Sequence, residues 1–459
     1  MDLTSLHAAP APPARFPDGH LRAFARDPLS FLTAAARLGP VVRLRFARTP
    51  ACLLSDPGLV EELLVVRQRD FIKARSIRAH RALLGDGLFT NEGDSWLRQR
   101  RLAQPAFHGE RIARYAAAMA EAAGRMLDGW RDGETREVHG EMKRLTAAVA
   151  ARTLFGGDVE REAPDLAASL EAVMQLHEGR RGLARFVPER VPLPRHVRYR
   201  RAIHRLEAIV SRFIRQRRAR GTPGDDLLSM LLHARDEDGR VMDDRQLRDE
   251  VLTLFVGAYD TPALALTWLV HLVSRHPEVA AALEAEIEHA LEGGTPEPGD
   301  IPYLRYVGMA VNEAMRVYPP AWMLAREAVR DTSLGGCAIP AGTMVLVSQW
   351  VLHRDPRWFE RPEAFVPERW SNALEKRLPR YAFFPFGAGP RVCIGASFAM
   401  MQTVIVFTMI LQRFRLGAVN EPVPLWPALT LRPRAGVHVS LSARRPPPST
   451  PLPAADVLA

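Results

Sequence analysis

Two hydrophobic periodicities divide the chain into extended and helical segments. In "VVRLRFARTPACLLSD", Val42, Leu44 and Phe46 alternate with arginines, which predicts two short strands around a turn. Further strands are predicted in "AGTMVLVSQWVLHRDP" and "LTLRPRAGVHVSL". Elsewhere the apolar positions recur at helical spacing, and amphipathic helices are predicted over residues 96–107, 112–130, 201–220 and 277–291. The pattern indicates a mainly helical protein with a small β-rich part.

The segment "VLTLFVGAYDTPALALTWLVHLV", residues 251–273, is apolar around nearly its whole circumference. Its length suits a membrane span, but Asp260 at the midpoint would cost roughly 2.5 to 3.5 kcal/mol in a bilayer. Pro262 beside it removes a helix hydrogen bond. We therefore expect a buried central helix with a polar notch. An acid next to the hydroxyl of Thr261 inside a core indicates a functional site.

Composition narrows the class of protein. The 459 residues are 47% hydrophobic and 25% charged, which fits one large globular domain or two closely packed ones. The net charge of +10 comes almost entirely from arginine, since lysine occurs only at Lys73, Lys143 and Lys376. The arginines are spread along the chain without an aromatic-interleaved module, so we expect no nucleic-acid partner, whereas an acidic protein partner stays open.

The cysteines and the two ends of the chain indicate the cellular compartment and the bounds of the folded domain. Cys52, Cys337 and Cys393 are too scattered for a disulfide framework or a zinc site, which favours a reducing cytoplasm. The amino terminus has neither a basic start nor an apolar stretch, so neither a signal peptide nor a membrane anchor is expected. Residues 1–18 and 445–459 are rich in proline and are expected to be disordered, which leaves residues 19–444 as a single domain.

The stretch "FFPFGAGPRVCIGASFAMM" presents Cys393 between a constrained loop and an apolar helix. Gly387, Gly389 and Pro390 fix the loop, and the N–H groups at the start of the helix favour a thiolate. A buried thiolate needs a cation, and a single cysteine cannot build a zinc or iron–sulfur site. The arrangement therefore favours a metal already held by a macrocycle, which is haem. The structural alternative is an inert core cysteine.

These residues resemble the haem-binding loop of the cytochrome P450 superfamily, whose pattern is F-G-x-G-x-R-x-C-x-G. The residues that match it are Phe386, Gly387, Gly389, Arg391, Cys393 and Gly395. The resemblance implies haem b with Cys393 as the axial ligand of the iron, Phe386 shielding the sulfur and Arg391 at a haem propionate. It also implies the family's fold, a mainly α triangular helical prism around haem with a small β-rich lobe.

Other motifs carry the same resemblance. Glu313 and Arg316 lie three residues apart on a predicted helix, and with Arg369 in "FVPERW" they resemble the family's Glu-Arg-Arg triad, a structural support for the haem loop. Trp96 and Arg100 resemble the W-x-x-x-R motif whose side chains reach a propionate. Arg326 stands where many members place another propionate partner.

The notch "GAYDTPALALTW" resembles the family's oxygen-activation segment. The resemblance implies that Asp260 relays protons from solvent and that Thr261 holds bound oxygen by a hydrogen bond. Pro262 departs from the family pattern, which has a second hydroxyl residue there. Because Pro262 leaves the carbonyl of Ala258 without its helical donor, we expect it to hold this turn of the helix open. Weaker proton delivery is the competing expectation.

The activity implied is monooxygenation of an apolar substrate with O2. No flavin or nicotinamide fingerprint is present, so the electrons are expected from ferredoxin and ferredoxin reductase, or a flavodoxin-type donor, with the enzyme a monomer. Arg98 and Arg101 are candidates for contact with an acidic ferredoxin. A terpene-like or other secondary-metabolite hydrocarbon is the favoured substrate, and a fatty acid paired with Arg75 or Arg78 is the alternative. A peroxide-using or isomerising haem-thiolate enzyme and a haem sensor remain the other classes.

Overall fold

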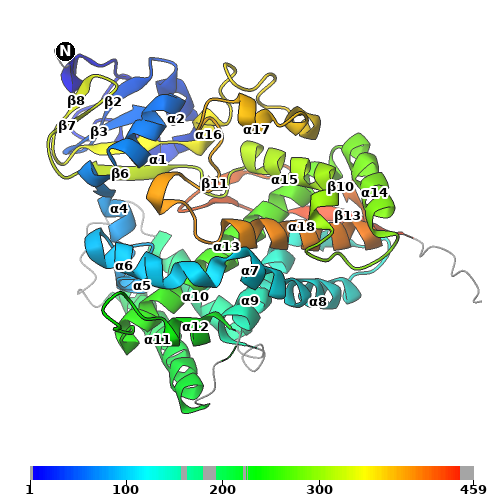
Figure 1. Ribbon diagram of the computed structural model, residues 1–459. Helices are drawn as coiled ribbons and strands as arrows, with labels where there is room; N and C mark the ends of the chain where they lie inside the picture. Colours follow the sequence, from blue (N-terminus) through cyan, green and yellow to red (C-terminus); the bar gives the residue numbers. More distant parts are fainter. Residues whose placement is uncertain (1–3, 157–162, 179–192, 221–223, 225, 445–459) are drawn as a thin grey trace, which may run out of the picture.

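Helices form most of the protein, and a smaller lobe at one side collects the N-terminal strands (Figure 1). The computed structural model describes residues 4–156, 163–178, 193–220, 224 and 226–444. The predicted tail at residues 445–459 lies outside the described residues. Within them, the helical prediction and the small β-rich lobe are both confirmed.

The α-helices occupy the following ranges. They are α1 (Leu21–Arg26), α2 (Pro28–Ala36), α3 (Pro57–Glu61), α4 (Arg75–Arg78), α5 (Arg81–Leu84), α6 (Gly93–Ala103), α7 (Gly109–Arg114), α8 (Ala116–Asp128), α9 (Val138–Phe155), α10 (Ala163–Glu178), α11 (Pro194–Arg220), α12 (Leu227–His233), α13 (Asp244–Ser274), α14 (Pro277–Leu291), α15 (Arg305–Val317), α16 (Gln349–Leu352), α17 (Leu374–Arg377) and α18 (Ala396–Arg413). The helix predicted over residues 112–130 is two helices, α7 and α8, which meet at Tyr115.

The strands form a five-stranded sheet, two three-stranded sheets and a hairpin. The five-stranded sheet has the order β2-β3-β9-β6-β4, from β2 (Val41–Phe46), β3 (Thr49–Leu54), β9 (Met344–Val347), β6 (Leu324–Ala328) and β4 (Phe71–Lys73). The smaller sheets are β1 (Thr4–Ser5), β8 (Cys337–Ile339) and β7 (Thr332–Leu334), and β10 (Phe414–Ala418), β13 (His438–Ala443) and β5 (Thr135–Glu137). The hairpin pairs β11 (Leu425–Pro427) with β12 (Leu431–Pro433).

The described part of the N-terminal segment is ordered, unlike the prediction for residues 1–18. β1 pairs in parallel with β8, and Leu6 is buried. Prolines lack an N–H, but their carbonyls still accept: the backbone N–H of Arg43 donates to Pro10 O at 2.8 Å. A proline-rich composition therefore did not prevent this segment from packing against the β-lobe.

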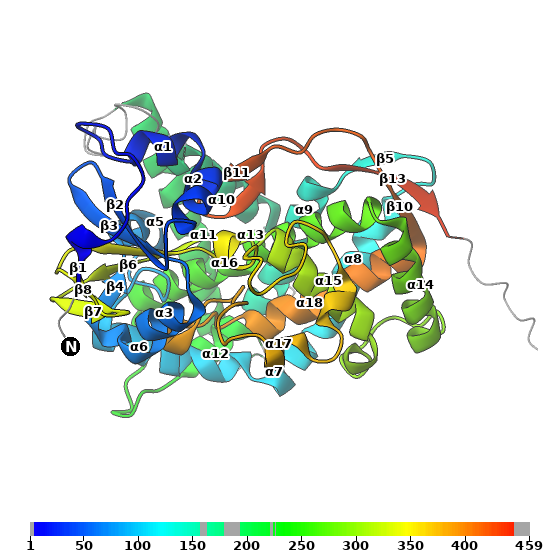
Figure 2. The same cartoon turned by 90° about the horizontal axis from the view of Figure 1, so that it is seen from above.

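Helix α13 runs through the middle of the helical part, as Figure 2 shows from above. It begins at the N-cap Asp243, whose side chain accepts from the N–H of Gln246. The helix packs against α9, α11, α15 and α18, which explains why its residues are apolar on nearly every face. The prediction of a buried central helix over residues 251–273 is confirmed.

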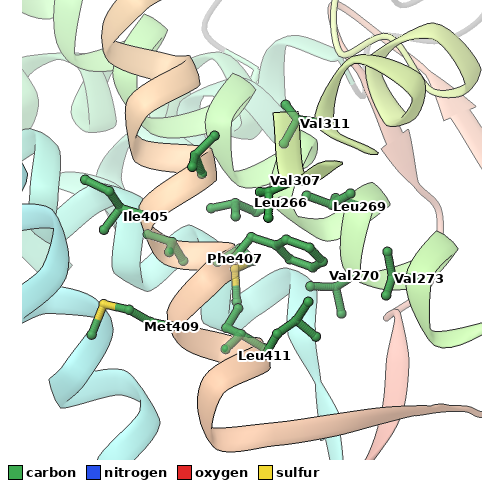
Figure 3. Close-up of a cluster of buried hydrophobic side chains, with 14 of the residues drawn as sticks. Leu266, Leu269, Val270, Val273, Val307, Val311, Ile405, Phe407, Met409 and Leu411 are labelled. Atoms are coloured by element: carbon green, nitrogen blue, oxygen red, sulfur yellow. The ribbon is translucent and has the colours of Figure 1, made fainter. Parts of the chain in front are cut away.

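The main core lies where α18 crosses α13 and α15. Figure 3 shows Phe407 of α18 pointing toward Leu266 and Val270 of α13, with Val307 and Val311 of α15 on the neighbouring side. All of these side chains are at most 1% exposed. This packing fixes the direction of α18, and therefore the place of the loop that precedes it.

Two helices among the described residues, α13 and α18, are long and apolar enough to cross a membrane. Most of each is covered by the protein itself, 72% of the apolar stretch of α13 and 61% of that of α18. Their apolar character is thus accounted for by packing in the core.

Candidate functional site

The loop before α18 presents Cys393 through backbone geometry that only glycine adopts readily. Gly387 and Gly389 have φ of 76° and 66°, in the left-handed region. A Cβ on Gly389 would also lie 2.1 Å from the carbonyl oxygen of Leu64, so a side chain there is excluded. The N–H of Cys393 donates to Phe386 O at 2.9 Å, and this bond closes the loop around the cysteine.

The pKa of the Cys393 thiol is shifted in the direction opposite to the one expected from the sequence. Although the side chain keeps accessible surface, the surrounding protein desolvates it, and this burial raises the pKa of the thiol above its usual value. The backbone N–H of Gly395 and the charge of Arg100 act in the opposite direction without reversing the shift. Burial therefore outweighs the effect of the start of α18 on the pKa, and a metal cation on the sulfur would favour its ionised form.

Arg391 lies against the ring of Trp96, which comes from α6. Its guanidinium carbon is 4.6 Å from the centre of the ring, and its Nη2 donates to the carboxylate of Glu92. Nη1 of Arg391 is buried and has no hydrogen-bond partner among the described residues. A buried guanidinium nitrogen without an acceptor indicates that a group outside the chain accepts from it.

Two further predicted residues lie close to this pair. Arg100 donates from Nη1 to the carbonyl oxygen of Val392 at 2.9 Å, which joins α6 to the cysteine loop. Arg326 donates to its neighbour Ala325 O at 3.1 Å, and burial lowers its pKa to about 10, with the charge of Arg391 adding to the effect. The structure thus brings Trp96, Arg100 and Arg326 together with the loop that carries Arg391 and Cys393.

Lys73 of β4 belongs to the same group, and the sequence analysis missed it. It is 7% exposed, and Nζ donates to Leu88 O at 2.9 Å and to Asn91 O at 2.7 Å. Its pKa is lowered to about 7, mainly by burial; the charge of Glu92 opposes this effect, and the charges of Arg391 and Arg326 add to it. The sequence did hold one indication of a special role for Lys73, which is that lysine is rare in this arginine-rich chain.

The charge of this cluster shows whether a haem group fits the site. Among the described residues, Glu92 is the carboxylate that meets them most closely, so the cluster carries more positive than negative charge. A haem carries two propionates, whose negative charges match this excess, and an iron that takes a thiolate. The donor set therefore fits a haem group, for which Cys393 would be the ligand and Arg326, Arg391, Arg100 and Trp96 would hold the propionates.

The predicted triad behind the loop is assembled in the core. Arg316 donates to both carboxylate oxygens of Glu313, at 2.9 and 2.8 Å, and Nε of Arg369 donates to the same carboxylate at 3.2 Å. Trp370 Nε1 and the N–H of Val366 also donate to this carboxylate, at 2.8 and 2.9 Å. The nearby His353 accepts from the N–H of Phe384 at 3.0 Å, and burial lowers its pKa, so it serves as a neutral support.

On α13, one face opens in the middle of an otherwise buried helix. Gly257 is exposed, and Ala258 and Thr261 are half-buried. A Cβ on Gly257 would meet no atom within 4 Å. The hydroxyl of Thr261 donates to Gly257 O at 2.9 Å, and Pro262 lies inside the continuous helix α13. This face therefore offers space and a hydroxyl group at the turn next to Pro262.

Asp260 points away from that face into the protein. It is 1% exposed; Oδ2 accepts from Thr430 Oγ1 at 2.8 Å, and Oδ1 accepts from Nη2 of Arg432 at 2.9 Å. Thr430 directly precedes β12, and Arg432 lies within this strand. The sequence analysis missed Arg432, because nothing in "LTLRPRAGV" distinguishes it from the many surface arginines.

The surface arginines singled out in the sequence have partners within the chain. Arg98 donates to Asp236 at 2.6 Å and Gln246 at 2.9 Å, and Arg101 pairs with Glu237 at 2.6 Å on the exposed surface. Arg75 and Arg78 pair with the carboxylate of Glu327, at 3.2 and 2.9 Å. None of these guanidinium groups lacks a carboxylate or amide partner in the structure.

Comparisons with known proteins agree with this geometry. The family model for cytochrome P450 matches residues 18–435. The chain is 38% identical over 408 residues to cyclooctat-9-en-7-ol 5-monooxygenase of Streptomyces melanosporofaciens, covering 88% of each chain. It is 34% identical over 440 residues to pentalenene oxygenase of Streptomyces avermitilis, covering 93% of this chain and 96% of the relative.

A solved structure gives the same fold. The structure of retinoic acid bound cyanobacterial CYP120A1 superposes with a TM-score of 0.86, covering 97% of this chain and 100% of that one. The two sequences are 23% identical, so this likeness concerns the fold alone.

Proposed function

The chain belongs to the cytochrome P450 family and is a monooxygenase of it, and on that premise we propose that it oxidises a terpene-like hydrocarbon of secondary metabolism. The family implies a haem-thiolate cofactor, a redox partner, O2 and an apolar substrate. The identity of the cofactor as haem b, the roles of the site residues and the class of substrate belong to the proposal. We further propose a single monooxygenase domain over residues 19–444 that works in the cytoplasm as a monomer.

Haem b, held by Cys393 and by the cations around Trp96, supplies the activation of O2 and the insertion of one oxygen atom into a C–H or C=C bond. The residues of the chain described next hold and orient the cofactor. The loop at Gly387 and Gly389 holds the sulfur in place, and the triad of Glu313, Arg316 and Arg369 supports that loop from behind. Trp96, Arg100, Arg326 and Arg391 orient the propionates.

Thr261 and Asp260, which lie on α13 and not in the loop of Cys393, would supply protons. Thr261 holds a hydroxyl proton beside the open face of α13, and Asp260 stands at the next position toward the interior. Each oxygen activation consumes protons, so a path from solvent must end at this hydroxyl. Pro262 keeps the turn at Ala258 open, which leaves room there for water and oxygen.

The observation that carries the substrate class is the pairing of Arg75 and Arg78 with Glu327. A fatty acid would need a cation for its carboxylate, and these two were the candidates. Partly buried side chains near α13 are apolar, among them Phe89, Val256 and Leu429. An uncharged, largely apolar substrate suits such a wall, and the names of the relatives give an alcohol, cyclooctat-9-en-7-ol, and a hydrocarbon, pentalenene.

Electrons are proposed to come from ferredoxin and ferredoxin reductase, or from a flavodoxin-type donor. The net charge of +10 suits an acidic partner. Arg101 remains the candidate contact on α6, because its pair with Glu237 is exposed and therefore weak. Arg98 is less suited, since its side chain is tied to Asp236 and Gln246.

The test is an optical titration of the haem-loaded protein with polycyclic terpenes, fatty acids and larger polyketides. We expect a thiolate-type Soret band that shifts from low to high spin with terpenes. A shift with fatty acids alone would contradict the proposed substrate. The variant Glu327→Gln is the matched control, because it releases Arg75 and Arg78 and should raise the response to fatty acids. A histidine-type spectrum would overturn Cys393 as the ligand.

A further inference from the structure

Helix α11 concentrates positive charge that the proposed reaction does not use. Ten of its 27 residues are arginine, and Glu207 is the one acidic residue in its sequence. The carboxylate of Glu207 pairs with Arg248 of α13 at 3.1 Å. Arg217 and Arg218 have carboxylate partners of their own, Asp226 and Asp244, near the end of the helix. The rest of α11 therefore carries a large excess of positive charge.

The exposed residues of α11 include a straight row along one face. Side chains three and four positions apart lie on the same face of a helix. We call the exposed row at this spacing the arginine stripe, and its members are Arg198, Arg201, Arg205, Ala208, Arg212, Arg215 and Ala219. The row contains no acidic residue. With a rise of 1.5 Å per residue, it is about 30 Å long.

Most arginines of the stripe have no counter-charge. Within the described part of the chain, four of them take part in no hydrogen bond or ion pair, and these are Arg198, Arg201, Arg205 and Arg215. Like charges one turn apart on a helix repel each other and destabilise it. An extended anionic surface laid against the stripe would remove this repulsion along its whole length.

The opposite face of α11 covers the apolar cluster beside the proposed substrate site. The ring centre of Phe213 lies 4.8 Å from that of Phe155 in α9, which lies 6.4 Å from that of Phe255 in α13. Val256 and Leu429, proposed above to face the substrate, pack against the same cluster. Figure 1 shows α11 at the lower edge of the molecule. The stripe therefore lies on the outer surface of the part that is proposed to hold the substrate.

A lipid surface suits the stripe better than a nucleic acid or the electron donor. The stripe holds no aromatic side chain on which bases could stack. The electron donor is proposed to meet Arg101 on α6, which is a different element. A membrane with anionic lipids presents negative head groups over an area long enough for the whole row. Its hydrocarbon interior also dissolves an apolar substrate of the proposed class.

We propose that the arginine stripe of α11 binds the anionic surface of a lipid membrane, so that the substrate side of the enzyme faces the membrane. The orientation toward the substrate rests on the proposed function, whereas the binding to lipid does not. The contact is electrostatic and reversible, because the apolar face of α11 is occupied in the protein core and is not available for insertion.

The test is sedimentation of the haem-loaded protein with lipid vesicles. We expect binding to vesicles of phosphatidylglycerol and phosphatidylcholine in equal parts, weak or no binding to phosphatidylcholine alone, and release as salt is raised. In the stripe variant, Arg198, Arg201, Arg205 and Arg215 are all replaced by glutamine, which helices accept well. Each arginine near an anionic surface contributes roughly fivefold to the affinity, so the stripe variant should bind about a hundredfold or more weakly.

The matched control removes the same charge from other places. It replaces by glutamine four exposed arginines that also have no partner within the described residues, namely Arg26, Arg305, Arg377 and Arg434. The control should keep most of the binding. An equal loss in both variants would show that only net charge matters and would overturn the stripe. A parent protein that ignores anionic vesicles, or prefers a DNA duplex at equal phosphate concentration, would overturn the lipid partner.

Delivery of substrate gives a second readout. A terpene dissolved in anionic vesicles should shift the Soret band of the parent protein faster than it shifts that of the stripe variant. Equal rates would overturn the orientation toward the membrane. With the terpene added without vesicles, the parent and the stripe variant should show the same shift. A failure of the stripe is therefore distinguishable from a failure of the proposed function, in which no terpene shifts the band of either protein.

Discussion

The guanidinium of Arg391 lies 4.6 Å from the centre of the Trp96 ring, with Glu92 on its other side. The contact joins the loop of Cys393 to α6, two segments almost 300 residues apart in sequence. It holds Arg391, whose buried Nη1 has no hydrogen-bond partner among the described residues, at the position proposed for a propionate. The contact therefore predicts how haem retention depends on both residues.

We predict that Trp96→Leu lowers the haem content of the purified protein several-fold. The substitution removes the ring that supports Arg391 and an N–H proposed for a propionate. Trp96→Phe keeps a ring and should lie between the parent and Trp96→Leu. The measurement is the ratio of haem to protein after gel filtration. Equal retention in the parent and Trp96→Leu would show that Trp96 only fills space.

The triad predicts a large loss of stability. Glu313 and Arg316 are both 0% exposed, and Arg316 also donates to the carbonyls of His353, Pro362 and Ala364. Arg316→Met leaves the carboxylate of Glu313 with less compensation and should lower the free energy of unfolding by about 3–5 kcal/mol. Urea unfolding of the haem-loaded protein measures it.

The control for the triad is Arg330→Gln. Arg330 also pairs with a carboxylate, that of Asp70, but its side chain is 65% exposed. An exposed pair of this kind contributes up to about 1 kcal/mol. Similar losses for Arg316→Met and Arg330→Gln would contradict the structural role of the triad.

The sequence predicted the features that depend on local pattern, and it missed those that depend on pairing across the fold. The loop of Cys393 and the pair of Glu313 and Arg316 lie within short motifs, so their residues are visible in a line of sequence. Arg432 reaches Asp260 from about 170 residues away and lies near Glu171, and neither Arg432 nor Glu171 has a local signal in the sequence. Lys73 was missed although lysine is rare in this chain, because its burial depends on contacts with Leu88 and Asn91 that the sequence pattern does not show.

The same distinction explains two differences in the fold. Residues 4–18 were expected to be disordered from composition, but β1 finds a partner in β8, more than 300 residues later. The sequence argument for Cys393 took the start of α18 to favour the thiolate, whereas burial, which depends on the whole fold, is the larger effect and raises its pKa.

We predict that Pro262→Ala stabilises the protein and impairs coupling. An alanine N–H would donate to Ala258 O and close the turn, which favours the helix by up to about 3 kcal/mol. With less room at Gly257, the share of electrons that ends in product should fall and peroxide should rise. Pro277→Ala is the control, since Pro277 occupies the first turn of α14, where no helix bond is lost. Unchanged oxygen binding and coupling in Pro262→Ala would contradict the open turn.

Glu250, in the first half of α13, predicts a specific dependence of stability on pH. Its side chain is 0% exposed, Oε2 accepts from the N–H of Leu88 at 3.2 Å, and Oε1 has no hydrogen-bond partner among the described residues. Burial raises its pKa to about 8; the charge of Asp249 adds to this, while Leu88 and Lys73 oppose it. The folded protein therefore holds a proton on Glu250 at pH values where the unfolded chain has lost it.

The sign of the effect follows from proton linkage. Between the ordinary pKa of 4.5 and about 8, the folded state binds more protons than the unfolded state, so the free energy of unfolding falls as pH rises. The slope is at most about 1.4 kcal/mol per pH unit. Glu250→Gln resembles the protonated acid and does not titrate. Its free energy of unfolding relative to that of the parent should therefore rise by this slope between pH 5 and pH 8. Urea midpoints across that range measure the difference. Parallel curves of stability against pH for the two proteins would show that Glu250 is not protonated in the folded protein at neutral pH.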